Sequence, residues 1–125
     1  MKMLLLIGCA GFSGTLLRWG GMRLVTHFCP NFPWGTLAVN ITGAFAAGFC
    51  FILCRTKFPT HEANFPILFA GFFGAFTTFS TFALESARFL LDGHYGKFFA
   101  NVLLQNAAGL AAACAGLLLA KHLFR

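Results

Sequence analysis

Charged residues are scarce in this sequence of 125 residues. Only 10% of the residues are Asp, Glu, Lys or Arg, just three of these are acidic, and 58% of the chain is hydrophobic. A soluble domain carries roughly 45–50% apolar and about 25% charged residues. So few charges cannot cover a surface that faces water. The composition therefore excludes an ordinary soluble domain and predicts a protein whose solvent is lipid.

Catalytic and metal-binding patterns are also missing. The sequence contains no recognisable nucleophile–base set or cluster of metal ligands, which argues against an enzyme. Its five cysteines are odd in number and include no Cys-x-x-Cys, so neither a disulfide framework nor a thiol redox site is expected. Cys50 and Cys54 lie one helical turn apart and are interpreted as small apolar residues rather than metal ligands. The net charge of +6 comes from scattered cations without a basic stripe, so no nucleic-acid partner is expected.

Long apolar stretches fill the chain instead. Four of them, at about 3–25, 36–54, 65–89 and 98–120, are long enough to span a bilayer, which takes about 20 residues. Short polar or Pro- and Gly-rich loops separate them. Small residues recur four apart, as in Ala44 with Gly48 and Ala112 with Gly116, which lets helices approach closely. We predict an all-α membrane protein in which residues 1–125 form a single domain of four transmembrane helices.

The cations are divided almost evenly between the two sides of this predicted bundle. With four spans, both termini and the middle loop share one side, which holds Lys2, Arg55, Lys57, Lys121 and Arg125. The other side holds Arg18, Arg23, Arg88 and Lys97. An excess of positive charge on one side normally fixes the orientation. Five against four favours insertion both ways round and hence an antiparallel homodimer; a weak bias hidden by approximate loop bounds is the alternative.

Polar residues inside the predicted spans are candidates for function, because they are costly in lipid. Arg18 in the first span either anchors the helix at the interface or faces an anion-attracting vestibule. Asn40 in the second span shares a face with Thr36 and Gly43, and this face suits either a pore wall or an interhelical hydrogen bond. The fourth span carries Asn101, Gln105 and Asn106, which either continue a polar track or bond a neighbouring helix.

The third span combines glycines, hydroxyls and phenylalanines between Gly71 and Phe82. Two glycines and two adjacent threonines weaken the helix and predict a break near residues 74–78, whose freed carbonyls could bind a cation. Phe79 and Phe82 are three residues apart and share a face. Because an aromatic ring has a positive edge, such a pair can contact a small anion without a full charge.

The chain resembles the CrcB/Fluc family of fluoride channels over nearly its whole length. The resemblance lies in the Gly-rich first helix ending at Arg18, the Pro-Trp-Gly-Thr-Leu-Ala-Val-Asn run ending at Asn40, and the Thr-Thr-Phe-Ser-Thr-Phe block ending at Phe82. It implies a dual-topology antiparallel homodimer in a prokaryotic cell (inner) membrane, exporting fluoride passively from the cytoplasm. In the fourth helix Asn106 stands where the family is expected to carry a small hydroxyl residue.

The resemblance also implies roles for individual residues. Asn40 would line the fluoride path, where Phe79 and Phe82 present ring edges and Ser80 and Thr81 present hydroxyls. Backbone carbonyls of Gly74 and Thr77 would hold a structural sodium ion between the two subunits, and Glu85 would lie near the mouth of the path. A small proton-coupled multidrug-type exporter is the alternative, although such exporters need an acidic residue deep in the membrane and the first span has none.

Overall fold

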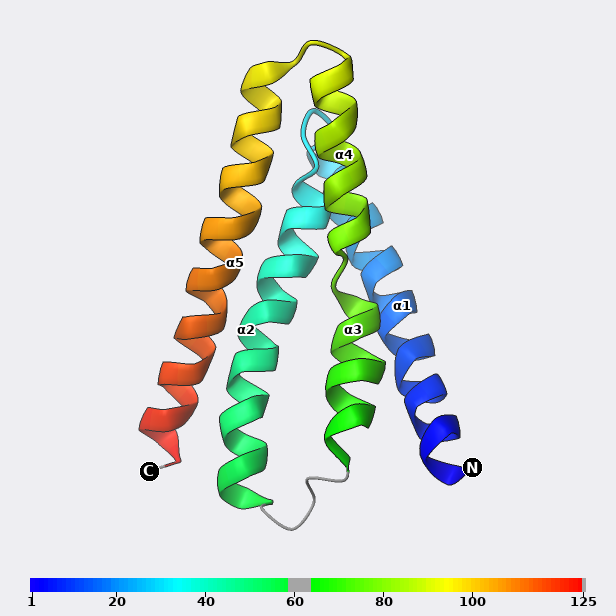
Figure 1. The fold of residues 1–125 in the computed structure, drawn as a ribbon, viewed down its shortest axis with the longest axis vertical. Helices are drawn as coiled ribbons and strands as arrows, with labels where there is room; N and C mark the ends of the chain where they lie inside the picture. The colour runs from blue at the N-terminus through cyan, green and yellow to red at the C-terminus, as the bar shows by residue number, and fades with distance from the viewer. Residues whose placement is uncertain (59–63, 125) are drawn as a thin grey trace.

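Helices make up nearly all of the described chain. The computed structural model describes residues 1–58 and 64–124, and these ranges contain helices and short connections but no strand. The helices are α1 (Lys2–Phe28), α2 (Trp34–Lys57), the π-helix η2 (Ile67–Phe73), α3 (Gly74–Phe76), α4 (Phe79–Leu91) and α5 (Tyr95–Leu123). They run alternately up and down, with η2, α3 and α4 forming one ascending segment (Figure 1).

Four helical segments are long and apolar enough to cross a bilayer: Lys2–Phe28, Trp34–Lys57, Ile67–Leu91 and Tyr95–Leu123. At about 1.5 Å per residue, 24 helical residues reach about 36 Å, which exceeds the roughly 30 Å hydrocarbon core. The prediction of an all-α protein with four membrane-spanning segments is therefore confirmed. Large apolar side chains such as Leu4 and Leu103 are about 70% exposed, as expected of a surface that lipid covers.

Glycines allow the helices to pack backbone to backbone. A Cβ atom at Gly116 of α5 would collide with the carbonyl oxygen of Phe45 on α2, and one at Gly48 of α2 would collide with that of Ala113. Gly14 gives α1 the same close approach to the carbonyl of Phe72 in η2. These contacts fix the distance and rotation between neighbouring helices, and so decide which polar side chains meet inside the bundle.

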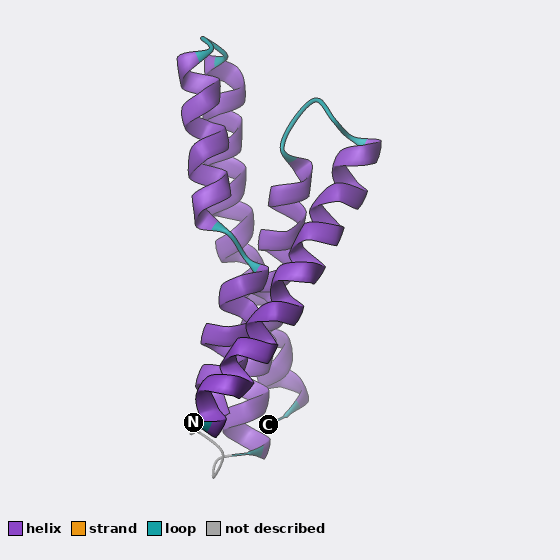
Figure 2. Cartoon of the chain, turned by 90° about the vertical axis from the view of Figure 1, so that its right-hand side faces the viewer, coloured by secondary structure: helices purple, strands orange, loops and turns teal. Residues whose placement is uncertain are grey.

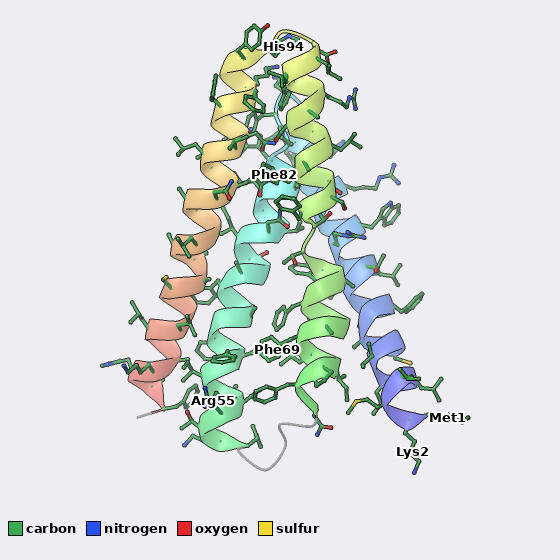
Figure 3. All side chains as sticks on the ribbon, viewed as in Figure 1. Met1, Lys2, Arg55, Phe69, Phe82 and His94 are labelled. Carbon is green, nitrogen blue, oxygen red and sulfur yellow. The ribbon has the colours of Figure 1, made fainter. Side chains whose placement is uncertain are left out.

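Both chain termini lie at the same end of the bundle (Figure 1). Lys2 and Arg55 are at this end, and His94 is at the other (Figure 3). Cations near the helix ends lie over aromatic rings: the Arg55 guanidinium is 5.6 Å from the centre of the Phe51 ring, and the Arg23 guanidinium is 4.9 Å from that of Trp19. Arg125, which the charge comparison included, lies outside the described residues.

The third span is bent. Its first part is the π-helix η2, which passes into the single turn of α3 and then, after two residues, into α4. Figure 2 shows the connection between α3 and α4 as a short loop in the middle of the segment, far from either end of the bundle. A π-helix and a bend at this depth often accompany functional sites.

Candidate functional site at the bend of the third span

Two residues of extended backbone separate α3 from α4. Thr77 has φ −90° and ψ 158°, and Thr78 has φ −146° and ψ 109°. Adjacent β-branched residues favour extended over helical backbone. Thr78 then caps α4, because its hydroxyl oxygen accepts a hydrogen bond from the Thr81 N–H at 3.2 Å. The threonine pair therefore both ends one helix and starts the next.

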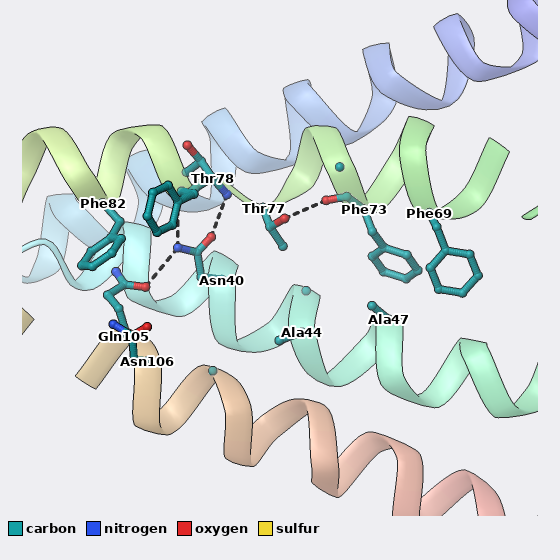
Figure 4. A pocket seen from close by; sticks show the side chains of 14 residues that line it. Asn40, Ala44, Ala47, Phe69, Phe73, Thr77, Thr78, Phe82, Gln105 and Asn106 are labelled. Atoms are coloured by element: carbon teal, nitrogen blue, oxygen red, sulfur yellow. Dashed lines mark hydrogen bonds between the residues drawn. The ribbon is translucent and has the colours of Figure 1, made fainter. Parts of the chain in front are cut away.

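Asn40 of α2 holds this extended segment in place (Figure 4). Its Oδ1 accepts a hydrogen bond from the Thr78 N–H at 2.8 Å, and its Nδ2 donates to the Thr78 carbonyl at 3.1 Å. Nδ2 also donates to Gln105 Oε1 of α5 at 3.0 Å. One amide thus joins α2, the bend and α5. The sequence left two alternatives for Asn40, a pore wall or an interhelical hydrogen bond. The hydrogen bond is present, and Asn40 also lines a pocket.

This pocket, which we call the hinge pocket, has a volume of about 460 Å³. It lies between α2, the third span and α5, and the bend forms part of its wall (Figure 4). Its lining residues are Asn40, Gly43, Ala44, Ala47, Phe69, Phe73, Gly74, Thr77, Thr78, Phe79, Phe82, Gln105, Asn106 and Gly109. The lining is thus mostly apolar with a few amides and hydroxyls, and it includes no charged side chain among the described residues.

Phe79 and Phe82 meet at one side of the hinge pocket. Their ring centroids are 5.4 Å apart with an interplanar angle of 69°, so the edge of one ring faces the other. Phe82 is buried inside the bundle, whereas Phe79 is 76% exposed and projects from it. Together they bring aromatic edges from the interior of the bundle to its surface.

Ser80 and Thr81 do not line the hinge pocket. The Thr78 hydroxyl donates to Thr81 Oγ1 at 2.9 Å and lies 3.2 Å from Ser80 Oγ, within hydrogen-bonding distance. In this single chain the hydroxyls therefore gather at the start of α4. Such a cluster stabilises the cap and offers a polar surface beside Phe79.

The backbone carbonyls of Gly74 and Thr77 lose their usual helical partners at the bend. In a continuous α-helix the Thr78 N–H would bond to the Gly74 carbonyl, and the Thr81 N–H to the Thr77 carbonyl. Here the first N–H donates to Asn40 and the second to the Thr78 hydroxyl. Both residues line the hinge pocket. Carbonyl oxygens released in this way are suitable ligands for a sodium ion.

A second polar site lies toward the α1–α2 and α4–α5 turns. Thr36 of α2 is 1% exposed and donates a short hydrogen bond of 2.6 Å to Glu85 Oε1 of α4. Glu85 lines a pocket of about 460 Å³ together with Arg88, Asp92 and Lys97. Arg18 is half-buried on α1 and is not among the residues that line either pocket, so the structure does not bring it to Glu85.

A buried polar contact joins α4 to α5, and it is one of the two alternatives that the sequence left open for Asn101. Asn101 is fully buried and donates to Ser86 Oγ at 3.0 Å, while the Ser86 hydroxyl donates to the Phe82 carbonyl at 2.9 Å. The sequence left the role of Asn101 open and did not single out Ser86. The available signal was the spacing of Ser86, which lies one helical turn beyond Phe82.

Fold and site together define a multi-pass membrane protein with a mostly apolar pocket, which carries a few amides and hydroxyls, at a bend in its third span. The family model described as "CrcB-like protein, Camphor Resistance (CrcB)" matches residues 5–117. The chain therefore belongs to the CrcB family.

Relatives named "Fluoride-specific ion channel FluC" match nearly the full length. The one from Desulforapulum autotrophicum is 40% identical over 116 residues, which cover 92% of this chain and 93% of the relative. The one from Legionella pneumophila is 39% identical over 123 residues, covering 94% and 89%. A third, from Nitrosococcus oceani, is 41% identical over 112 residues, covering 88% and 89%. The likeness thus includes all four spans and the bend.

Proposed function

We propose that this protein is a fluoride-selective channel that lets fluoride leave a prokaryotic cell passively through the cell (inner) membrane. The observation that carries the proposal is the hinge pocket, in which Phe79 and Phe82 meet amides and released carbonyls at the bend. Relatives that match this chain over nearly its full length are named fluoride-specific ion channels. Passive export would relieve the toxicity of fluoride that enters as the neutral acid and is trapped as the anion.

The chemistry of the site suits a small, strongly hydrated anion. Fluoride loses its water only if compact donors replace it, and amide N–H groups, hydroxyls and the positive edges of aromatic rings are such donors. Phe79 and Phe82 offer ring edges, and Ser80 and Thr81 offer hydroxyls beside them. Because none of these groups carries a full charge, the ion is held weakly enough to leave.

A second copy of the chain in antiparallel orientation would complete the site. Bent backbone at membrane depth is tolerated where protein covers it or where it lines a cavity, not where it faces lipid. Yet Gly74 at the bend is exposed in the single chain, and Phe79 is 76% exposed. The near balance of cations on the two sides allows both orientations to insert, so the partner would be an inverted copy.

The carbonyls of Gly74 and Thr77 fit a structural sodium ion. Both lose their helical partner at the bend, and both belong to residues that line the hinge pocket. Two such oxygens from each of two copies give a set of four hard ligands, which suits a hard monovalent cation. A bound sodium ion supplies positive charge that compensates the carbonyl dipoles, and it is not transported.

Ion release from liposomes tests the proposal. Purified protein in liposomes loaded with potassium fluoride and potassium chloride, with sodium present and valinomycin added to carry out the balancing potassium ions, should release fluoride rapidly and retain chloride, without a proton gradient. Replacing Phe82 by Ile removes a ring edge, and a loss of about 1.4 kcal/mol at the barrier slows release about tenfold. Phe12→Ile is the matched control, because Phe12 is 67% exposed on α1. Release that requires a proton gradient would instead support a proton-coupled exporter.

A further inference from the structure

Asn40 lines the hinge pocket, yet its amide has no donor left for an ion. An asparagine Nδ2 carries two hydrogens. One is donated to the Thr78 carbonyl at 3.1 Å and the other to Gln105 Oε1 at 3.0 Å. Its oxygen accepts from the Thr78 N–H at 2.8 Å. An anion in the hinge pocket therefore needs a donor other than Asn40.

The orientation of these amides follows from the backbone of Thr78. A backbone N–H only donates and a carbonyl only accepts, so the atoms of Asn40 that face them must be oxygen and nitrogen respectively. The Gln105 atom that meets Asn40 Nδ2 must then be an acceptor, which makes it Oε1. Hence Gln105 Nε2 points away from Asn40, and a flip of either amide would bring two donors or two acceptors together.

Gln105 Nε2 is a buried donor without a hydrogen-bond partner among the described residues. The Gln105 side chain is 8% exposed, and it lines the hinge pocket together with Phe79 and Phe82. Asn101 lies one turn earlier on α5, and its buried Oδ1 is also without a partner among the described residues, so it does not satisfy Gln105. A buried donor left unpaired costs about 1–3 kcal/mol, and native proteins rarely leave one without a ligand or a water.

We propose that Gln105 Nε2 is the donor that binds the permeating halide in the hinge pocket. Asn40 is then a positioning residue: it holds Gln105 by its oxygen and leaves both N–H groups free on a side chain that lines the hinge pocket together with Phe82. A neutral amide suits this task because a charged donor would retain the ion. The assignment rests on the proposed channel function and names the donor within it.

Asn106 is the competing amide in the same pocket. It is exposed, and its Nδ2 already donates to the Val102 carbonyl of its own helix at 2.7 Å. Water can satisfy its remaining hydrogen, whereas Gln105 Nε2 has no partner among the described residues. The two adjacent residues therefore provide a matched comparison on one helix.

Side-chain amide NMR tests the assignment in the intact, unsubstituted protein. The ¹H–¹⁵N signals of the Gln105 side chain, identified by their loss in Gln105→Glu, should shift when sodium fluoride is added to protein in nanodiscs. Sodium chloride at the same concentration should leave them in place. Fluoride-induced shifts confined to Asn40 or Asn106 would overturn the assignment.

Fluoride release from liposomes separates the two roles that Gln105 can have. Gln105→Glu keeps the oxygen that accepts from Asn40 but removes the donor, and Gln105→Met removes both. Each should slow fluoride release about tenfold, as for a loss of about 1.4 kcal/mol at the barrier. Asn106→Asp controls for added negative charge and should slow release less than Gln105→Glu.

The outcomes distinguish this assignment from the channel function itself. Unchanged release in Gln105→Glu would mean that Gln105 only holds Asn40, and the assignment would fail. Release by the unsubstituted protein without a fluoride-dependent Gln105 shift would also overturn the assignment while the channel function stands. A shift without any release by the unsubstituted protein would contradict the channel and leave the fluoride site in place.

Discussion

Replacing Asn40 by Ala should destabilise the bundle more than any other single loss of a polar side chain in α2. The substitution removes three hydrogen bonds, of 2.8, 3.0 and 3.1 Å, that join the bend and α5 to α2. It also strands the N–H of Thr78, a residue that is 4% exposed, whereas the Thr78 carbonyl, at the N-cap of α4, still accepts the first hydrogen bond of that helix. Alanine occupies less space and offers no replacement partner, and the site is sheltered from water.

The expected size of this effect follows from the three lost bonds. Side-chain hydrogen bonds within membrane bundles average about 0.6 kcal/mol each, which gives about 2 kcal/mol for three. A buried backbone group left unpaired costs about 1–3 kcal/mol, so the stranded N–H of Thr78 sets an upper range of about 3 kcal/mol. We therefore expect the free energy of unfolding to fall by about 2–3 kcal/mol.

Reversible unfolding in mixed micelles, followed by circular dichroism, measures this change. Thr42→Ala is the matched control, because Thr42 is exposed on the same helix and its hydroxyl donates only to carbonyls of α2 itself, chiefly that of Ala38 at 2.7 Å. The control should stay within about 0.5 kcal/mol of the unsubstituted protein. Hydrogen exchange should show the Thr78 amide exposed in Asn40→Ala alone. A fall below about 0.5 kcal/mol, with that amide still protected, would refute the reasoning.

Three further predictions follow from the packing and the polar contacts. Gly116→Ala should lower the free energy of unfolding by about 1–3 kcal/mol, because the added methyl group meets the Phe45 carbonyl. Gly109→Ala is the control and should not lower it, because the space around Gly109 is open. Equal effects of the two substitutions would contradict the packing. Thr36→Val should lower the free energy of unfolding by about 1–3 kcal/mol in the same assay, because both oxygens of Glu85 are then unpaired. Glu85→Gln is the control, because it keeps an oxygen that accepts the hydrogen bond from Thr36. Replacing all sodium by N-methylglucamine should abolish fluoride release and lower the melting temperature, and an unchanged melting curve would argue against a structural sodium ion.

The overall architecture could be predicted because lipid leaves a chain few options. Backbone groups in a bilayer must be satisfied within helices or closed barrels, so four apolar runs of sufficient length predict four helices. The helix ends differ from the predicted bounds by only one to three residues. The π-helix Ile67–Phe73 was not predicted, because no local pattern of residues distinguished it from an α-helix; in the structure Gly71 allows it to lie close to the Ile7 carbonyl on α1.

The site could be predicted only in part, because spacing gives the face of a helix and not its partner. Asn40 was identified as important, but its three bonds to Thr78 and Gln105 depend on how α2 and α5 are rotated against each other. That rotation is set by glycine contacts between the two helices. Ser80 and Thr81 were expected along the path, and in the single chain their hydroxyls meet at the cap of α4 instead of the hinge pocket. The donor end of Gln105 could be assigned only once these bonds were known.

Current recording across a planar bilayer tests the central claim, passive conduction selective for fluoride, most directly. With a tenfold fluoride gradient, equal chloride on both sides and sodium present, the current should reverse at about 59 mV, the value for a monovalent ion. A superimposed pH gradient should leave that potential unchanged. A reversal potential that shifts with the pH gradient, or one near zero, would contradict a passive fluoride-selective channel.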